Sequence, residues 1–125
     1  MRLFSTILLA LLASALFIRV APAAPHHAQA PFFHQDRTVE VKGTVQKWLF
    51  ANPHPVLFVE AEENGAKVIW QIQFAPASVL AKRGWSKTTF QPGETVIASG
   101  HPSREPGTHG MEIGVIKRAD GSPVR

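Results

Sequence analysis

The chain has 125 residues, no cysteine and a formal net charge of +4, and this composition excludes several classes of protein. Without cysteine it cannot form disulfides, iron–sulfur clusters or c-type haem attachments, so its fold must be held by an apolar core. Arg2 and Arg19 lie in a predicted leader, and residues 24–125 carry eleven basic against nine acidic residues. Because this small excess includes no basic block, the sequence predicts no nucleic-acid partner.

The first 23 residues are typical of a cleavable signal peptide. The positive residue Arg2 follows Met1, and an apolar run covers residues 3–18. The small residues Ala21 and Ala23 then lie at the two positions that a signal peptidase recognises. The run is shorter than the roughly 20 residues that span a bilayer, which disfavours the alternative of a membrane anchor. We therefore expect cleavage after Ala23, export to the periplasm or beyond, and no stable membrane span in the mature chain.

Residues 24–37 are rich in alanine, proline and histidine and have no periodicity. They predict a mobile arm, pinned where Phe32 and Phe33 meet the domain. The domain itself is predicted over residues 38–125.

Alternating apolar residues predict a long first strand over residues 39–50. Its apolar phase changes along the way, so an extra residue must be absorbed at Gly43 or at the pair Gln46-Lys47. Asn64-Gly65, between two apolar runs, is the strongest short-range signal for a hairpin. The remaining predicted elements are strands at 56–60 and 68–74, a short helix at 76–83, and strands at 95–98 and 111–115.

Three strands, a short helix and two further strands are the element order of an OB-fold, a five-stranded Greek-key barrel. The predicted fold class is therefore all-β: a small OB-like barrel with one short helix between its third and fourth strands. A plain β-sandwich or an open meander of the same strands is the alternative.

No catalytic motif stands out: the chain lacks His-Glu-x-x-His, Gly-x-Ser-x-Gly and any phosphate-binding glycine loop. The first hypothesis for function is therefore a non-catalytic periplasmic binding or accessory module. A hydrolase with an unrecognised site is an alternative, because catalytic groups converge in space rather than in sequence.

The candidate contact residues surround a histidine between two prolines. His54 lies in Asn52-Pro53-His54-Pro55, where the prolines restrict its backbone in advance. Most aromatic residues are predicted to lie in the core, but Trp48 and Trp85 join Asn52 and His54 as candidates for contacting a periplasmic protein or a small ligand.

A second hypothesis assigns the histidines to copper or zinc, metals that imidazole binds well. In an OB-fold the loops after the first and fourth strands lie at the same rim. His54 lies on the first of these loops, and His101 and His109 bracket the second, while His26 and His27 of the arm are free to join.

A set of residues spread along the chain forms a familiar pattern: His26-His27, Gly43, Val45, Trp48, Asn52-Pro53-His54, Gly65, Trp70, Leu80, Gly84-Trp85 and Pro92-Gly93. With these residues the chain resembles a family of short exported bacterial proteins catalogued as domain of unknown function 6152. The resemblance runs from about His26 to Gly100. It implies a periplasmic setting and an OB-like barrel, and it supplies no activity.

The chain departs from this family at two places. Ala28 follows the histidine pair where the family usually has serine, and residues 104–109 lack its Asp-Gly turn. His101 and His109 are therefore not features that the resemblance supports.

Overall fold

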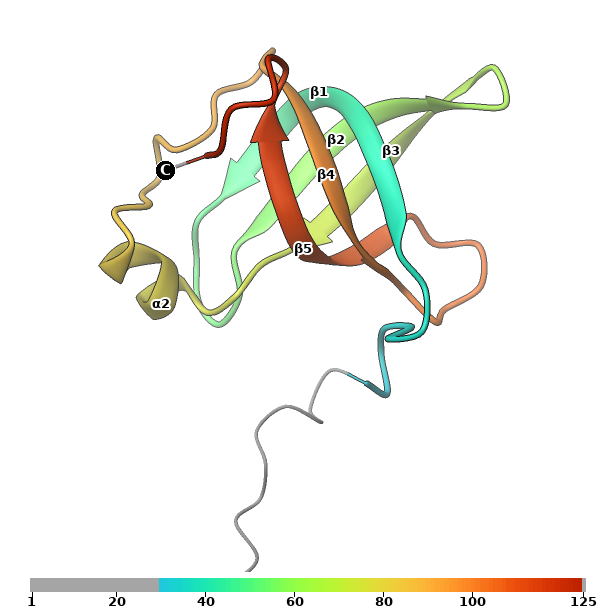
Figure 1. The fold of residues 1–125 in the computed structure, drawn as a ribbon, viewed down its shortest axis with the longest axis horizontal. Helices are drawn as coiled ribbons and strands as arrows, with labels where there is room; N and C mark the ends of the chain where they lie inside the picture. Colours follow the sequence, from blue (N-terminus) through green and yellow to red (C-terminus); the bar gives the residue numbers. More distant parts are fainter. Residues whose placement is uncertain (1–29, 125) are drawn as a thin grey trace, which may run out of the picture.

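Five strands and one short helix account for the regular structure of residues 30–124, which the computed structural model describes (Figure 1). The predicted signal peptide and residues 24–29 of the predicted arm, with His26 and His27, lie outside the described residues. The elements are β1 (Val39–Leu49), β2 (Val56–Glu63), β3 (Ala66–Gln73), α2 (Ala77–Lys82), β4 (Thr95–Pro102) and β5 (Gly110–Arg118).

The strands close into a barrel in the order β1-β2-β3-β5-β4, with β4 returning to β1. All neighbours are antiparallel except β3 and β5, which run parallel over only three residue pairs, from Gln71↔Gly110 to Gln73↔Glu112. This closed arrangement, with α2 between β3 and β4, confirms the predicted OB-like barrel and excludes the alternative of an open meander.

β1 is long because it serves both halves of the barrel. Its first half pairs with β4 and its second half with β2, and Thr44 lies opposite a residue of each. The register with β2 shifts between Val45 and Lys47, so Gln46 is the extra residue. The bulge therefore lies at the second of the two places that the apolar phase indicated.

The Asn64-Gly65 turn joins β2 and β3 as predicted, with positive φ angles of 52° and 79°. β4, in contrast, runs further than the sequence indicated, so His101 lies in a strand and not in the following loop. Gly100 permits this extension, because a Cβ atom there would collide with the carbonyl oxygen of Glu112 on β5. A β-bulge beside it, between Ser99 and Gly100, absorbs the irregularity.

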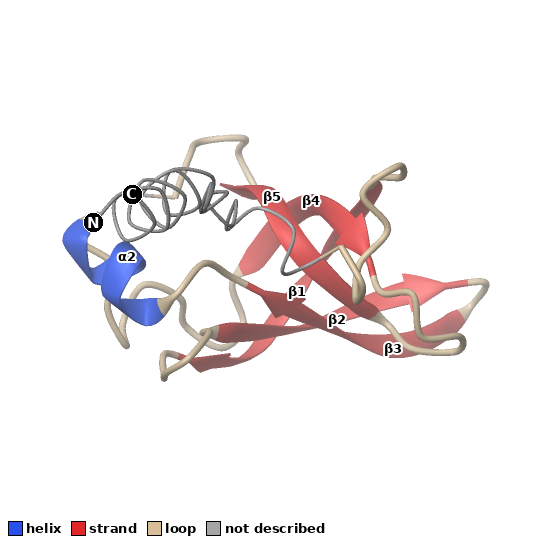
Figure 2. Ribbon diagram, turned by 90° about the horizontal axis from the view of Figure 1, so that it is seen from below, coloured by secondary structure: helices blue, strands red, loops and turns tan. Residues whose placement is uncertain are grey.

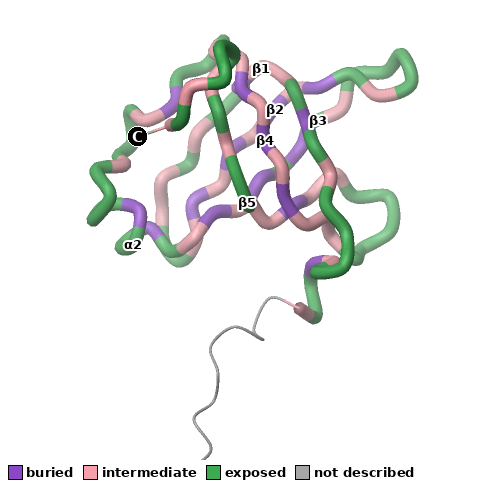
Figure 3. Tube along the Cα trace, viewed as in Figure 1, coloured by how far each residue is buried: buried purple, intermediate pink, exposed green. Residues whose placement is uncertain are grey.

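Alternate strand residues fill the barrel interior, where Figure 3 shows the buried positions. Trp70 is buried, as its phase in the strand predicted. Each large apolar side chain that is fully buried contributes about 1.5–3 kcal/mol to the stability of the fold. The buried cluster consists of Val41, Val45, Leu57, Val59, Ala61, Trp70, Ile72, Phe74, Leu80, Phe90, Val96, Ala98 and Met111.

α2 lies at the opposite end of the molecule from the β2–β3 hairpin (Figures 1 and 2). It follows Pro76, buries Ala77 and Leu80, and is followed by Gly84 with a φ of 87°. Within residues 30–124, no helix combines the length and the hydropathy needed to cross a bilayer.

Candidate functional site

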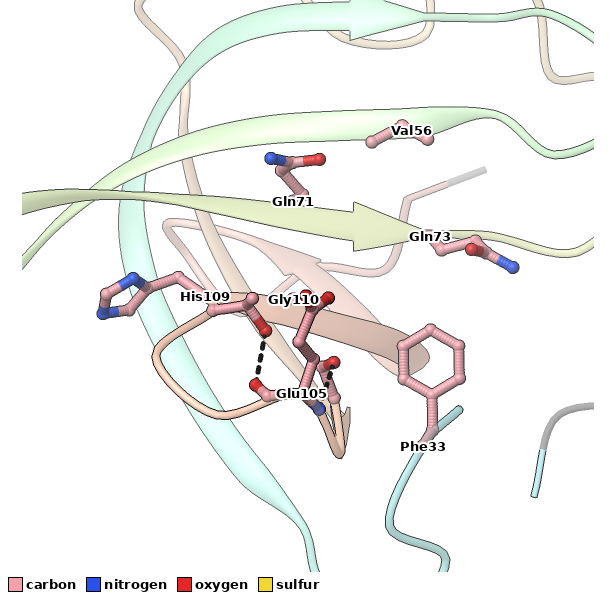
Figure 4. Close-up of a pocket in the computed structure, with 9 residues that line it drawn as sticks. Phe33, Val56, Gln71, Gln73, Glu105, His109 and Gly110 are labelled. Atoms are coloured by element: carbon pink, nitrogen blue, oxygen red, sulfur yellow. Dashed lines mark hydrogen bonds between the residues drawn. The ribbon is translucent and has the colours of Figure 1, made fainter. Parts of the chain in front are cut away.

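A pocket of about 250 Å³ opens where the ends of β2 and β3 meet the loop between β4 and β5. Figure 4 shows Val56 on β2, Gln71 and Gln73 on β3, and Glu105 and His109 on the loop. The lining residues are Phe33, Val56, Gln71, Gln73, Ser103, Glu105, Thr108, His109 and Gly110.

Phe33 reaches the pocket because the segment before β1 adds a short bridge to the loop. Phe33 pairs with Ser103, and the N–H groups of His34 and Arg104 donate to the carbonyls of Pro102 and Phe32, both at 2.9 Å. The Phe33 side chain is buried, whereas that of Phe32 is 64% exposed. Of the two phenylalanines expected to meet the domain, Phe33 therefore does so.

The loop over residues 103–109 is braced by its own hydroxyl groups. The Ser103 hydroxyl accepts the N–H of Glu105 at 3.1 Å, and the Thr108 hydroxyl donates to the Glu105 carbonyl at 2.9 Å. The N–H of Gln71 donates to the His109 carbonyl at 2.7 Å, which joins the loop to β3. These bonds fix the loop side of the pocket relative to the strand side.

The His109 side chain lies at the end of the pocket away from Phe33 (Figure 4). Its ring meets Trp70 edge-on with centroids 5.5 Å apart, and its Nε2 lies 3.3 Å from a Glu63 carboxylate oxygen. The other oxygen of Glu63 accepts the Trp70 indole N–H at 2.7 Å. His109 is thereby held against the β2–β3 hairpin, and the amides and hydroxyls make up most of the pocket's polar lining.

The candidates His54, Trp48 and Trp85 all meet at Phe74, the residue that follows β3. His54 Nδ1 donates to the Phe74 carbonyl at 2.8 Å. The ring of Phe74 lies 5.2 Å from that of Trp48 and 5.5 Å from that of Trp85, between centroids. Asn52 is exposed on the same loop, before a cis peptide bond to Pro53.

This aromatic group packs against the barrel core at the α2 end. The indole N–H of Trp48 donates to the Ser86 carbonyl at 2.8 Å, which holds the segment after α2 against β1. His54, Trp48 and Trp85, which were predicted as one group of contact residues, therefore do lie close together. None of the four candidates lines the pocket in Figure 4. Val56, which follows the His54 loop, does line it.

The three described histidines of the metal hypothesis do not form the expected cluster. His101 Nδ1 donates to the Arg37 carbonyl at 2.8 Å, while His54 and His109 have partners on other elements. Within residues 30–124, no three histidine, aspartate or glutamate side chains are grouped so that they could hold a metal ion. Each of the three rings thus has a separate partner, the Phe74 carbonyl, the Arg37 carbonyl or the Glu63 carboxylate.

Sequence reasoning missed most of the pocket. Of its lining, only His109 was among the candidates. Gln71 and Gln73 had a readable signal, because they are polar residues on the outward phase of a strand whose inward phase is Trp70 and Ile72. Phe33 and the loop hydroxyl groups had no such signal in the sequence, because only long-range pairing of the chain brings them to the pocket.

A closed five-stranded barrel with this strand order and helix position places the chain among OB-fold proteins. Two crystal forms of Rim1, the mitochondrial single-stranded DNA-binding protein of S. cerevisiae, share the fold with a TM-score of 0.51 each. Their sequence identities are 9% and 10%, and the match covers 66% of this chain and 92% and 94% of theirs. At this identity the likeness concerns the fold alone.

The family of unknown function DUF6152 matches residues 15–112. Because this range is most of the chain, the protein belongs to that family, as the resemblance of its motifs indicated. No curated protein matches the chain.

Proposed function

We propose that the protein is an exported, non-catalytic binding module, and that the pocket beside the β4–β5 loop is its ligand site. The observation that carries this proposal is the chemistry of the lining. Gln71, Gln73, Ser103 and Thr108 supply uncharged donors and acceptors, and the Phe33 ring supplies an apolar wall. A few placed polar groups beside an apolar surface are typical of binding sites.

Glu105 adds a carboxylate to the lining, which disfavours an anionic ligand. The uncharged groups favour a ligand rich in hydroxyl or amide groups, and we assign a saccharide as its class. Glutamine amides both donate and accept, so they match hydroxyl groups, which do the same. OB-folds use the outer face of strands 2 and 3, with the loop between strands 4 and 5, to bind oligosaccharides and oligonucleotides. The volume of about 250 Å³ lies below the roughly 300–1,000 Å³ of sites for drug-sized ligands, which suits a single sugar unit.

NMR titration with triacetylchitotriose, a saccharide that carries both hydroxyl and acetamido groups, tests the proposal. The amide signals of Gln71, Gln73, Ser103 and Thr108 should shift together with one dissociation constant. Gln71→Ala should weaken binding by roughly threefold to tenfold, the value of one neutral hydrogen bond.

Gln46→Ala is the matched control, because Gln46 is an exposed glutamine of the β1 bulge and lies away from the pocket. It should leave the affinity unchanged. Equal losses in the two variants, or shifts confined to the α2 end of the barrel, would overturn the assignment of this pocket. The absence of any shift at millimolar saccharide would overturn the ligand class.

A further inference from the structure

A second hollow of about 390 Å³ lies at the end of the β3–β5 pairing away from the first pocket. The parallel pairing of these strands ends at Gln73↔Glu112, after which the chain leaves β3 for α2. From Ile113 onward, the edge of β5 that had paired with β3 therefore borders the groove beside the α2 segment, while its other edge stays paired with β4. The C-terminal residues turn back at the far end, where Pro123 bridges Lys117. We call this hollow the α2–β5 groove.

Most of the residues that line the α2–β5 groove are apolar. Leu80 and Trp85 form the α2 side, and Ile113 and Ile116 form the β5 side. Its volume is within the range of small-molecule sites, and its lining has the aromatic and aliphatic character typical of them. An occupant should therefore carry a hydrocarbon or aromatic body.

Two donors of the lining have no partner among the residues that the structure describes. Arg83 is exposed and makes no ion pair within residues 30–124. The indole N–H groups of Trp48 and Trp70 donate to protein oxygens, but that of Trp85 has no hydrogen bond to a described residue. Tryptophan N–H groups usually find an acceptor when they are partly buried, and guanidinium binds carboxylates.

Glu112 also lines the groove, and its carboxylate accepts the side-chain amide of Gln35 at 3.2 Å. Because this carboxylate already has a partner, the guanidinium of Arg83 is the charged group of the lining that is open to a ligand. An anion is attracted to it.

We propose that the α2–β5 groove binds an amphipathic anion, with its carboxylate at Arg83 and the Trp85 N–H, and its apolar body against Leu80, Ile113 and Ile116. The site is separate from the pocket proposed to bind saccharide. Charge complementarity at Arg83, in a mostly apolar hollow, is what selects this class of ligand.

Calorimetric titration of the purified protein with dodecanoate, below its micelle-forming concentration, tests the proposal. Dodecyltrimethylammonium, which has the same chain and the opposite charge, is the ligand control and should bind at least about tenfold more weakly. Arg83→Gln should weaken dodecanoate binding about tenfold, the effect of losing one hydrogen bond between charged groups. It should leave triacetylchitotriose binding as it was.

Lys82→Gln is the matched variant, because Lys82 is the exposed neighbour of Arg83 and does not line the groove. It should change the affinity for dodecanoate by less than twofold. The proposal is overturned if both ligands bind alike, if the two variants lose equally, or if dodecanoate does not bind. An uncharged apolar pentapeptide that binds as tightly as dodecanoate would also overturn it, in favour of a polypeptide occupant.

Discussion

At the scale of single residues, the imidazole of His54 is a structural donor. A carbonyl oxygen can only accept, so the 2.8 Å contact with Phe74 requires the proton on Nδ1. This bond closes the loop after β1 onto the end of β3, across 20 positions of sequence. The flanking prolines predicted a restricted backbone at this position. The acceptor of the hydrogen bond could not be predicted from the sequence, because the closing of the barrel brings the Phe74 carbonyl to the ring.

His54→Ala should lower the free energy of unfolding by about 1 kcal/mol, since it removes one half-buried hydrogen bond to the Phe74 carbonyl. His54→Asn should retain most of the stability, because the asparagine amide places a donor near the position of Nδ1. Urea denaturation followed by tryptophan fluorescence measures both. Equal losses in the two variants would contradict a role that depends on the donor.

At the scale of elements, the strands near the hairpin were predicted better than those near the β4–β5 loop. Residues 68–74 alternate cleanly, and β3 ends within one residue of the expected place. β4 continues through Ser99-Gly100-His101-Pro102, a stretch whose composition is typical of a turn. Pairing with β5 overrides this local preference, because the strand fills the space between β1 and β5 in the closed barrel.

Gly100→Ala should destabilise the protein by about 1–3 kcal/mol, because its Cβ atom would collide with the backbone of Glu112 and the strands must separate to admit it. Gly110→Ala is the control on the neighbouring strand. Its Cβ atom would lie 3.4 Å from that of Ser103, an ordinary contact. Thermal unfolding should show a lower midpoint for the first variant only, and a tolerated Gly100→Ala would contradict the close approach of β4 and β5.

At the scale of the whole molecule, both proposed sites depend on the short parallel pairing of β3 and β5. The saccharide pocket lies beside the paired residues Gln71 and Gly110, and the α2–β5 groove begins where the pairing ends at Glu112. The order of elements in the sequence predicted the barrel. It did not predict either hollow, because the pairing joins residues about forty positions apart and its length decides where each hollow opens.

Export is a prediction about the whole chain, and it concerns residues outside those that the structure describes. A culture expressing residues 1–125 should yield a periplasmic or secreted protein whose mass and N-terminal sequence place its first residue at Ala24. Ala23→Leu puts a large side chain where the peptidase requires a small one, so the precursor should accumulate uncleaved. Ala28→Leu, beyond the cleavage site, should be processed normally. A wild-type protein that keeps residues 1–23 would contradict cleavage and would leave the apolar run as an anchor of the domain.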